Sequence, residues 1–147
     1  ETHPAVLKLE KFIPLFIQED LSDIQNQIRL NIQPELSIRF DEAQLRQILI
    51  NLVRNAIRHN DPAHPYIEIN VRSELKKVQI DVRDFGQGVA TQDQAQLFQP
   101  FFSTEITGTG LGLYLAHSFC EANQAQLSYV EQKQGACFRI VSQQAVL

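Results

Sequence analysis

The expected strands of this chain come in pairs, and the expected helices separate the pairs. Residues 66–72 and 77–83 alternate apolar with polar side chains across a short connection, which predicts an antiparallel hairpin. Residues 125–130 and 136–141 repeat this pattern around Gly135. Paired strands separated by helices favour an α+β fold. We therefore expect a two-layer α+β sandwich, in which a mixed, mostly antiparallel sheet carries its helices on one face.

The other segments supply those helices and two further strands. Residues 41–59 combine a capping residue, Asp41, with an apolar stripe at helical spacing, and Gln44 stands where it would complete a capping box. The remaining expected elements are strands over 27–33 and 36–40 and helices over 11–21, 90–96 and 111–122, the last with Leu111, Leu115 and Phe119 on one face. At 147 residues the chain is long enough to bury one core, so we expect a single domain over residues 1–147.

Composition excludes several classes of partner. The net charge is −4 and no Lys/Arg cluster stands out, so nucleic acid is not expected to bind. No apolar run approaches the roughly 20 residues that span a bilayer, so no direct membrane contact is expected. Cys120 and Cys137 fit neither a metal spacing nor a redox motif, and we interpret them as buried hydrophobic residues of a cytoplasmic protein. The chain begins with Glu1 and has no Met, which suggests a piece of a longer protein.

A polar stripe borders the apolar face of the expected long helix. Gln47, Asn51, Asn55 and Arg58 share one side, because residues four and seven apart lie on one face. A solvated polar face would explain the stripe, and Arg58 in particular could simply face solvent. However, solvated faces favour Lys and Glu, and Asn is a poor helix former. Mg²⁺ takes oxygen ligands and needs few protein atoms when phosphates share its coordination, so an Asn oxygen suits it.

Asp84 ends a strand with its side chain on the buried side. The apolar residues at positions 78, 80 and 82 point into the expected core. Asp84 follows two residues after position 82, so its side chain is expected to point to the same side. A buried carboxylate is costly without a partner. A turn-forming role is one explanation, since Gly86 and Gly88 follow. The alternative is that a ligand supplies the donor, and the exocyclic amine of adenine would serve.

A glycine-rich segment, Gly108–Leu113, opens the expected helix over 111–122. Its position before a helix and not after a strand excludes a Rossmann turn, and it lacks the Gly-Lys-Ser/Thr of a P-loop. It could be a flexible loop, or its free N–H groups and the helix dipole could cradle a triphosphate. Asp84-Phe85-Gly86 is not the corresponding motif of eukaryotic protein kinases, because no Val-Ala-Ile-Lys strand or His-Arg-Asp loop precedes it.

Four segments in a fixed order carry a family resemblance. Asn51–Asn55, Asp84–Gly88, Leu97–Phe102 and Gly108–Leu113 resemble the N, G1, F and G2 boxes of the GHKL ATPase/kinase superfamily. The branch they resemble most is the ATP-binding catalytic domain of sensor histidine kinases, and the likeness covers about residues 5–143. It implies a Bergerat-type ATP-binding fold that uses ATP and Mg²⁺.

The resemblance also implies roles for single residues. It assigns Mg²⁺ to Asn55, adenine recognition to Asp84, a phosphate contact to Arg58 and the ribose edge to His59. Close approach of backbone to base is assigned to Gly86 and Gly88. Anchoring of a lid is assigned to Phe98, Phe101 and Phe102, which could equally be local core. A triphosphate cradle at the lid is assigned to Gly108, Thr109, Gly110, Leu111 and Gly112. Glu105 departs from the pattern, because many relatives carry Lys there.

Asn51 distinguishes between branches of the superfamily. Gyrase, Hsp90 and MutL usually carry a Glu there as general base, because water must lose a proton to attack. A neutral imidazole is already nucleophilic, so Asn51 fits a histidine kinase, with Asn51 and Asn55 as the catalytic residues. The alternatives are a GHKL ATPase that drives a conformational change, or a non-catalytic ATP-sensing module.

The resemblance implies that the phosphoacceptor histidine lies outside this chain. None of the four histidines, at positions 3, 59, 64 and 117, matches the family's phosphoacceptor motif. We expect residues 1–5 to be a linker from an upstream dimerisation/phosphoacceptor domain, and a response regulator as a further partner. The full protein is expected to be a membrane-anchored homodimer, and this domain a cytoplasmic monomer. Pro100–Thr104 and Cys120–Ala125 resemble the type IV pilus and nitrogen-regulator subgroup.

Overall fold

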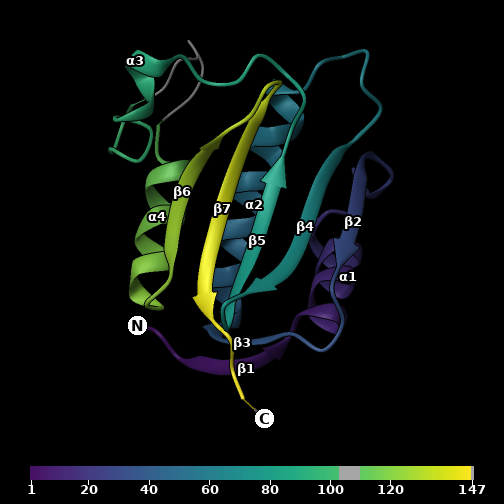
Figure 1. Cartoon of the computed structure of the whole chain (residues 1–147), viewed down its shortest axis with the longest axis vertical. Helices are drawn as coiled ribbons and strands as arrows, with labels where there is room; N and C mark the ends of the chain where they lie inside the picture. The colour runs from purple at the N-terminus through teal and green to yellow at the C-terminus, as the bar shows by residue number, and fades with distance from the viewer. Residues whose placement is uncertain (103–109, 147) are drawn as a thin grey trace.

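A computed structural model of the chain describes residues 1–102 and 110–146. Figure 1 shows two layers, a sheet in front and helices behind it. The strands are β1 (Pro4–Lys8), β2 (Ile28–Ile32), β3 (Ser37–Asp41), β4 (Ile67–Glu74), β5 (Lys77–Arg83), β6 (Gln126–Glu131) and β7 (Ala136–Gln143). The helices are α1 (Leu9–Asp20), α2 (Glu42–His59), α3 (Thr91–Gln94), α4 (Gly112–Ala122) and the short 3-10 helix η1 (Gln25–Gln27). The predicted two-layer α+β sandwich is confirmed.

The main sheet has five strands in the order β2-β4-β5-β7-β6. Strands β2 and β4 are parallel and every other neighbouring pair is antiparallel, so the sheet is mixed and mostly antiparallel, as predicted. Strands β1 and β3 form a separate two-stranded sheet beside both chain termini (Figure 1). The opposite end of the main sheet carries the loop after β5 and lies near the C-terminal end of α2.

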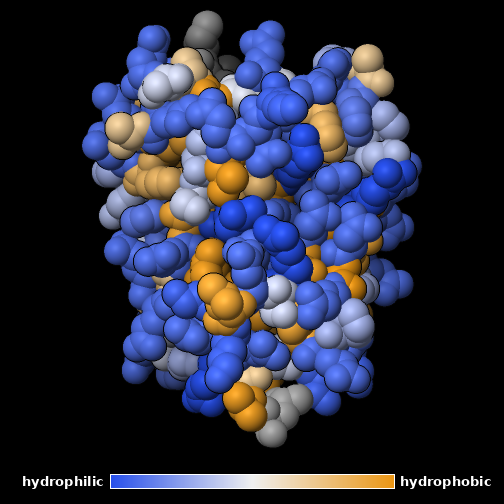
Figure 2. All heavy atoms as spheres, in the orientation of Figure 1, coloured by the Kyte–Doolittle hydropathy of each residue, from blue (hydrophilic) through white to orange (hydrophobic). Residues whose placement is uncertain are grey.

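The core lies between α2 and the central strands. Residues Val78, Ile80 and Val82 of β5 are buried, and the apolar stripe of α2 meets them with Leu45, Ile48, Leu49, Leu52, Val53 and Ala56. The other face of the sheet is mostly hydrophilic (Figure 2). Cys120 and Cys137 are buried, as predicted, and burial raises the pKa of each thiol to about 12. Within residues 1–102 and 110–146, no helix is long and apolar enough to cross a membrane.

The start of α2 is capped as predicted, but by a different network. The Asp41 carboxylate accepts a hydrogen bond from the Gln44 N–H at 3.0 Å. The reciprocal bond of a capping box is absent from the described contacts, because the Asp41 N–H donates to Asn123 Oδ1 at 2.8 Å. Gln44 Oε1 in turn accepts from Asn123 Nδ2 at 2.7 Å. The residue after α4 thus ties that helix to the start of α2.

Three sequence expectations differ from the structure. Pro4 and Ala5, expected in a linker, belong to β1 and pair with Asp41 and Phe40. In α4 the buried residues are Ala116 and Cys120, whereas Leu115, expected on the apolar face, is 39% exposed. Small residues face α2 here because close helix packing favours short side chains. The predicted helix over 90–96 is reduced to the single turn of α3.

Candidate functional site

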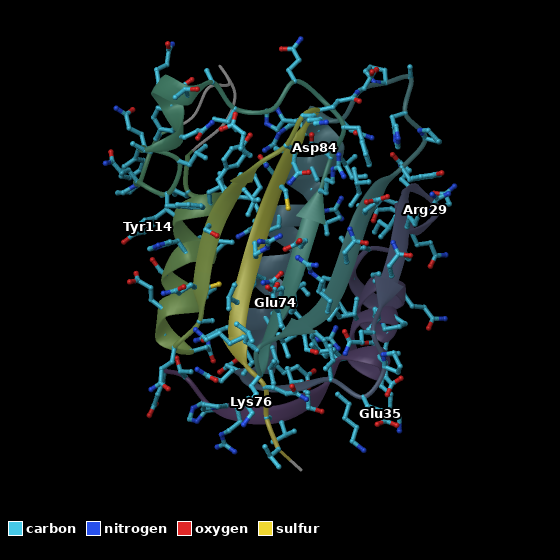
Figure 3. All side chains as sticks on the ribbon, in the orientation of Figure 1. Arg29, Glu35, Glu74, Lys76, Asp84 and Tyr114 are labelled. Atoms are coloured by element: carbon cyan, nitrogen blue, oxygen red, sulfur yellow. The ribbon has the colours of Figure 1, made fainter. Side chains whose placement is uncertain are left out.

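A cleft of about 1150 Å³ opens at the end of the sheet where β5 and α2 finish. Figure 3 shows Asp84 at this end, just beyond β5. The walls come from α2, the loop after it, the loop after β5, the start of α4 and the turn between β6 and β7. The predicted site residues that line it are Asn51, Asn55, Arg58, His59, Asp84, Gly86, Gly88, Phe102, Gly110 and Gly112.

The polar stripe of α2 forms one wall of this cleft. The Asn51 amide donates from Nδ2 to the Gly112 carbonyl at 3.1 Å, and its Oδ1 accepts from Gln47 at 3.1 Å. Within residues 1–102 and 110–146, Asn55 Oδ1 accepts only a long hydrogen bond, 3.4 Å, from Arg58 Nη2. Asn55 therefore presents a weakly engaged amide oxygen to the cleft, which is the kind of atom that Mg²⁺ prefers.

Asp84 is 2% exposed, as its parity with the buried residues of β5 predicts. Its Oδ1 accepts from the Gly86 N–H at 2.9 Å and from the Ala136 N–H at 3.1 Å. Oδ2 accepts neither of these two bonds. Burial raises the pKa of the Asp84 carboxyl above its ordinary 3.8, although these hydrogen bonds and the charges of His59 and Arg83 act to lower it. The turn interpretation is therefore confirmed for Oδ1, and the ligand interpretation stays a prediction for Oδ2.

The glycines of the base loop, residues 84–89, are required by neighbouring backbone. A Cβ on Gly86 would lie 1.9 Å from the His59 carbonyl oxygen. Gly88 has a φ of 76°, and its Cβ would lie 2.9 Å from the Gly135 carbonyl oxygen. The resemblance implied that these glycines let the backbone approach a base; the structure adds that they let the loop approach α2 and the β6–β7 turn.

Some predicted site residues lie away from the cleft or outside the described chain. Phe98 does not line the cleft; its ring stacks on His117 at 5.1 Å and lies edge-on to Phe138 at 6.1 Å, so it is local core. Phe101 is 76% exposed and contributes neither to the core nor to the cleft wall. Leu111 precedes α4 and is not part of the lining either. Gly108 and Thr109 lie outside the described residues.

Several lining residues were missed from the sequence. Arg54 belongs to the α2 wall, where its guanidinium pairs with Asp23 at 3.2 Å. Helical spacing could have found Arg54, because it follows Gln47 by seven residues. Gln134 comes from the β6–β7 turn and Ala136 begins β7, and no local pattern marks them. Asn60, the residue after α2, also lines the cleft and was treated only as the start of a loop.

No group of three or more His, Cys, Asp or Glu side chains among the described residues could hold a metal ion. A resident metal centre built from such ligands is therefore not present in this part of the chain. Mg²⁺ that arrives with phosphates needs only one or two protein oxygens, so Asn55 could suffice.

Comparison with known proteins identifies the family of the chain. The family model of histidine kinase-, DNA gyrase B-, and HSP90-like ATPases matches residues 40–145. The chain is 36% identical to the sensor protein kinase PilS of Pseudomonas aeruginosa over 95% of its length, and 30% identical to the sensor histidine kinase ZraS of Escherichia coli over 84%. It spans only 28% and 27% of those two proteins.

Solved structures agree with the sequence relatives. The catalytic domain of histidine kinase ThkA superposes with a TM-score of 0.81 at 24% identity, covering 96% of this chain and 95% of that one. Full-length ShkA in complex with AMPPNP also gives 0.81, at 25% identity, covering all of this chain and 32% of that one. The chain therefore belongs to the family of histidine kinase-, DNA gyrase B- and HSP90-like ATPases, and within it to the ATP-binding catalytic domains of sensor histidine kinases.

Proposed function

We propose that this domain binds ATP with Mg²⁺ and presents the γ-phosphoryl group to a histidine on a separate dimerisation/phosphoacceptor domain. One observation supports this above all. A buried carboxylate, Asp84, and a stripe of amides, Asn51 and Asn55, face the same cleft from the sheet and from α2. A ligand that satisfied both would carry a hydrogen-bond donor at one end and metal-bound or anionic oxygens at the other, and ATP·Mg²⁺ does.

The proposed roles follow the chemistry of each wall. Asp84 Oδ2 accepts from the adenine amine, and His59 lies at the ribose edge. Asn55 would hold Mg²⁺, which neutralises charge on the phosphate oxygens when bound. Arg58, on the same wall, is proposed to contact phosphate, and the positive end of the α4 helix dipole, beside Gly110 and Gly112, favours anions. Gly108 and Thr109 are proposed to extend that cradle.

Catalysis in this proposal is positioning and charge neutralisation. The imidazole of the acceptor histidine is already nucleophilic when neutral, so the domain needs no general base. Asn51 supports this, since an amide cannot take a proton from water at neutral pH. A GHKL ATPase would need a base at that position. A non-catalytic ATP-sensing module is the other alternative, but Asn55, Asp84 and the glycines that line the cleft are all in place.

The proposal extends to partners that lie outside this chain. We propose that the full protein is a homodimer, in which the acceptor histidine precedes this domain, and that a response regulator receives the phosphoryl group. ThkA has been solved in complex with the response regulator protein TrrA, at 21% identity to this chain. The likeness to PilS supports a role in type IV pilus regulation. Because ATP is a cytoplasmic substrate, we place the domain in the cytoplasm.

The base-recognition step can be tested by competition of ATP and GTP against a fluorescent ATP analogue. Guanine presents a carbonyl oxygen where adenine presents its amine, so GTP would set two acceptors against each other. An unsatisfied buried group costs about 1–3 kcal/mol, so ATP should bind at least about tenfold more tightly. Asp84→Asn should weaken ATP binding and reduce the difference between the affinities for ATP and GTP. If the variant keeps both the affinity and the ratio, Asp84 is only a turn residue.

The phosphotransfer step needs a second experiment. With labelled ATP, the chain alone should acquire no acid-labile phosphate, because none of its histidines lies in an acceptor motif. Addition of a dimerisation domain that carries the family's phosphoacceptor motif, a His followed by an acidic residue and a nearby Pro, should produce label on that domain. Release of free phosphate at the same rate without an acceptor would instead support the ATPase alternative.

A further inference from the structure

The side chain of Asn60 joins three segments at the edge of the cleft. Its Oδ1 accepts from the Phe85 N–H at 2.8 Å. Its Nδ2 donates to the carbonyl oxygens of His64 and Tyr66, both at 3.4 Å. One amide therefore connects the end of α2, the loop over residues 61–66 and the base loop. The short bond of the three is the one to the base loop.

That short bond acts on the peptide unit next to Asp84. The Phe85 N–H belongs to the peptide that links Asp84 to Phe85, so the bond restrains the rotation that follows the Asp84 Cα. The carbonyl oxygen of the same peptide lies against the backbone of Gly135, where an added Cβ would be 2.0 Å from it. Asn60 thus bonds to one side of this peptide unit, and the β6–β7 turn packs closely on the other.

The surrounding contacts keep the base loop against the end of α2. Gly86 packs so closely on the His59 carbonyl that no side chain fits between them. The Phe85 ring stacks on His64 with a centroid distance of 3.9 Å and an interplanar angle of 13°. Asn60 adds a hydrogen bond from the residue after α2 to the backbone of the loop. On the other side of the loop, Gln134 Nε2 donates to the Phe85 carbonyl oxygen at 3.0 Å.

We propose that Asn60 is a positioning residue for the nucleotide base. By holding the Phe85 N–H, it keeps Asp84 in the orientation in which Oδ1 satisfies two backbone N–H groups and Oδ2 faces the cleft. This inference rests on the proposed function, since it takes Asp84 as the residue that recognises adenine. Asn60 itself acts through Asp84 and need not touch the base.

The test compares Asn60→Ala with Asn60→Asp by the ATP and GTP competition described above. Asn60→Ala leaves the Phe85 N–H without its acceptor. It should lower ATP affinity about tenfold, equivalent to about 1.4 kcal/mol, and reduce the preference for ATP over GTP. Asn60→Asp keeps an oxygen at the Phe85 N–H and should retain the preference. The added negative charge of Asn60→Asp should weaken the binding of ATP and of GTP alike. The ratio of the two affinities therefore isolates the positioning effect.

Asn31→Ala is the matched control. Asn31 Nδ2 donates to Asn70 Oδ1 at 2.7 Å on an exposed part of the sheet that does not line the cleft, so this variant should keep both affinities. The proposal is overturned if Asn60→Ala keeps the wild-type ratio, or if Asn60→Asp loses it as fully as Asn60→Ala. The second result would assign the effect to the 61–66 loop.

Two further outcomes have a defined meaning. If circular dichroism shows that Asn60→Ala does not fold, Asn60→Ser replaces it in the test. The serine hydroxyl ends one bond short of the Asn60 oxygen, so this variant also takes the acceptor away from the Phe85 N–H. A wild-type ratio in Asn60→Ser then overturns the proposal. If the unmodified chain binds neither nucleotide, or binds both equally, the role of Asp84 fails first, and the role of Asn60 fails with it.

Discussion

The side-chain amide of Asn51 donates a hydrogen bond to the carbonyl oxygen of Gly112, 3.1 Å away. The bond joins the middle of α2 to the first residue of α4 across 61 residues of sequence. A residue expected at the ligand is thereby also a link between the two helices that border the cleft. A change at Asn51 should then affect stability as well as activity.

We expect Asn51→Ala to lower the free energy of unfolding by about 1 kcal/mol, the net value of a typical hydrogen bond. Gln47→Ala is the control, because it removes the bond to Asn51 Oδ1 and leaves the bond to Gly112 intact. Urea denaturation of the three chains without nucleotide provides the measurement. Equal stability of Asn51→Ala and the unmodified chain would show that the bond to Gly112 contributes no more than the up to about 0.7 kcal/mol that alanine gains in helix propensity.

Asn55→Ala should remove most of the Mg²⁺ dependence of ATP binding. Asn55 lines the cleft, and in the part of the chain that the structure describes its amide oxygen accepts only a long bond from Arg58, so we expect it to be available to the metal. Calorimetry with ATP in the presence and absence of Mg²⁺ measures the dependence as a ratio of two affinities. That ratio should approach one in Asn55→Ala and stay unchanged in Asn31→Ala. An unchanged ratio in Asn55→Ala would remove this residue from the metal role.

Two motif glycines should respond in opposite ways to alanine. A Cβ on Gly86 would lie 1.9 Å from a backbone oxygen of His59, so Gly86→Ala must displace the base loop or the end of α2. Overpacking of this kind costs about 1–3 kcal/mol, and ATP affinity should fall with it. On Gly112 the nearest atom would be Asn51 Cγ at 3.9 Å, an ordinary contact.

Gly112→Ala should therefore leave stability unchanged or raise it by up to about 1 kcal/mol, since alanine loses less backbone entropy in a helix. Thermal unfolding of the two variants beside the unmodified chain checks both expectations. Equal destabilisation by the two substitutions would contradict the close contact at Gly86.

Asp84→Asn should gain stability relative to the unmodified chain as the pH rises. Burial raises the pKa of Asp84 in the folded chain. As the pH rises, the carboxyl therefore loses its proton at a lower pH in the unfolded chain than in the folded chain. Above the ordinary pKa of 3.8, deprotonation therefore favours the unfolded state, until the pH passes the raised value of the folded state. Asparagine has no such proton.

The measurement is the free energy of unfolding of both chains from pH 3 to pH 7, without nucleotide. The difference between them should move in favour of Asp84→Asn across this range. A difference that is constant with pH would mean that the hydrogen bonds from Gly86 and Ala136 fully offset the burial of the charge.

Local periodicity was sufficient for most of the elements, apart from β1 and the extent of α3, and for the direction of several site residues. Strand residues alternate between two faces, so the burial of β5 at positions 78, 80 and 82 already placed Asp84 inward. The stripe of α2 similarly placed Asn51 and Asn55 beside the apolar face. These predictions were correct because backbone geometry alone determines which residues of one element share a face.

The helix α4 shows where that reasoning stops. The pattern predicted Leu111, Leu115 and Phe119 as its apolar face, yet Ala116 and Cys120 are the buried residues. An element with apolar residues on several sides is oriented by its neighbour, and α2 accepts small side chains at this contact. The amphipathic pattern could not reveal which partner the helix meets.

The sequence by itself determined the paired strands, the amphipathic α2 and the residue types that suit a nucleotide. Only the tertiary structure brought the Ala136 N–H to Asp84, 52 residues away, and the amide of Asn60 to Phe85, 25 residues away. It also showed that Gly86 and Gly135 are glycines because other segments of backbone pass within van der Waals distance. Such contacts depend on how separate elements pack, and no repeat of polar and apolar residues along one element records that.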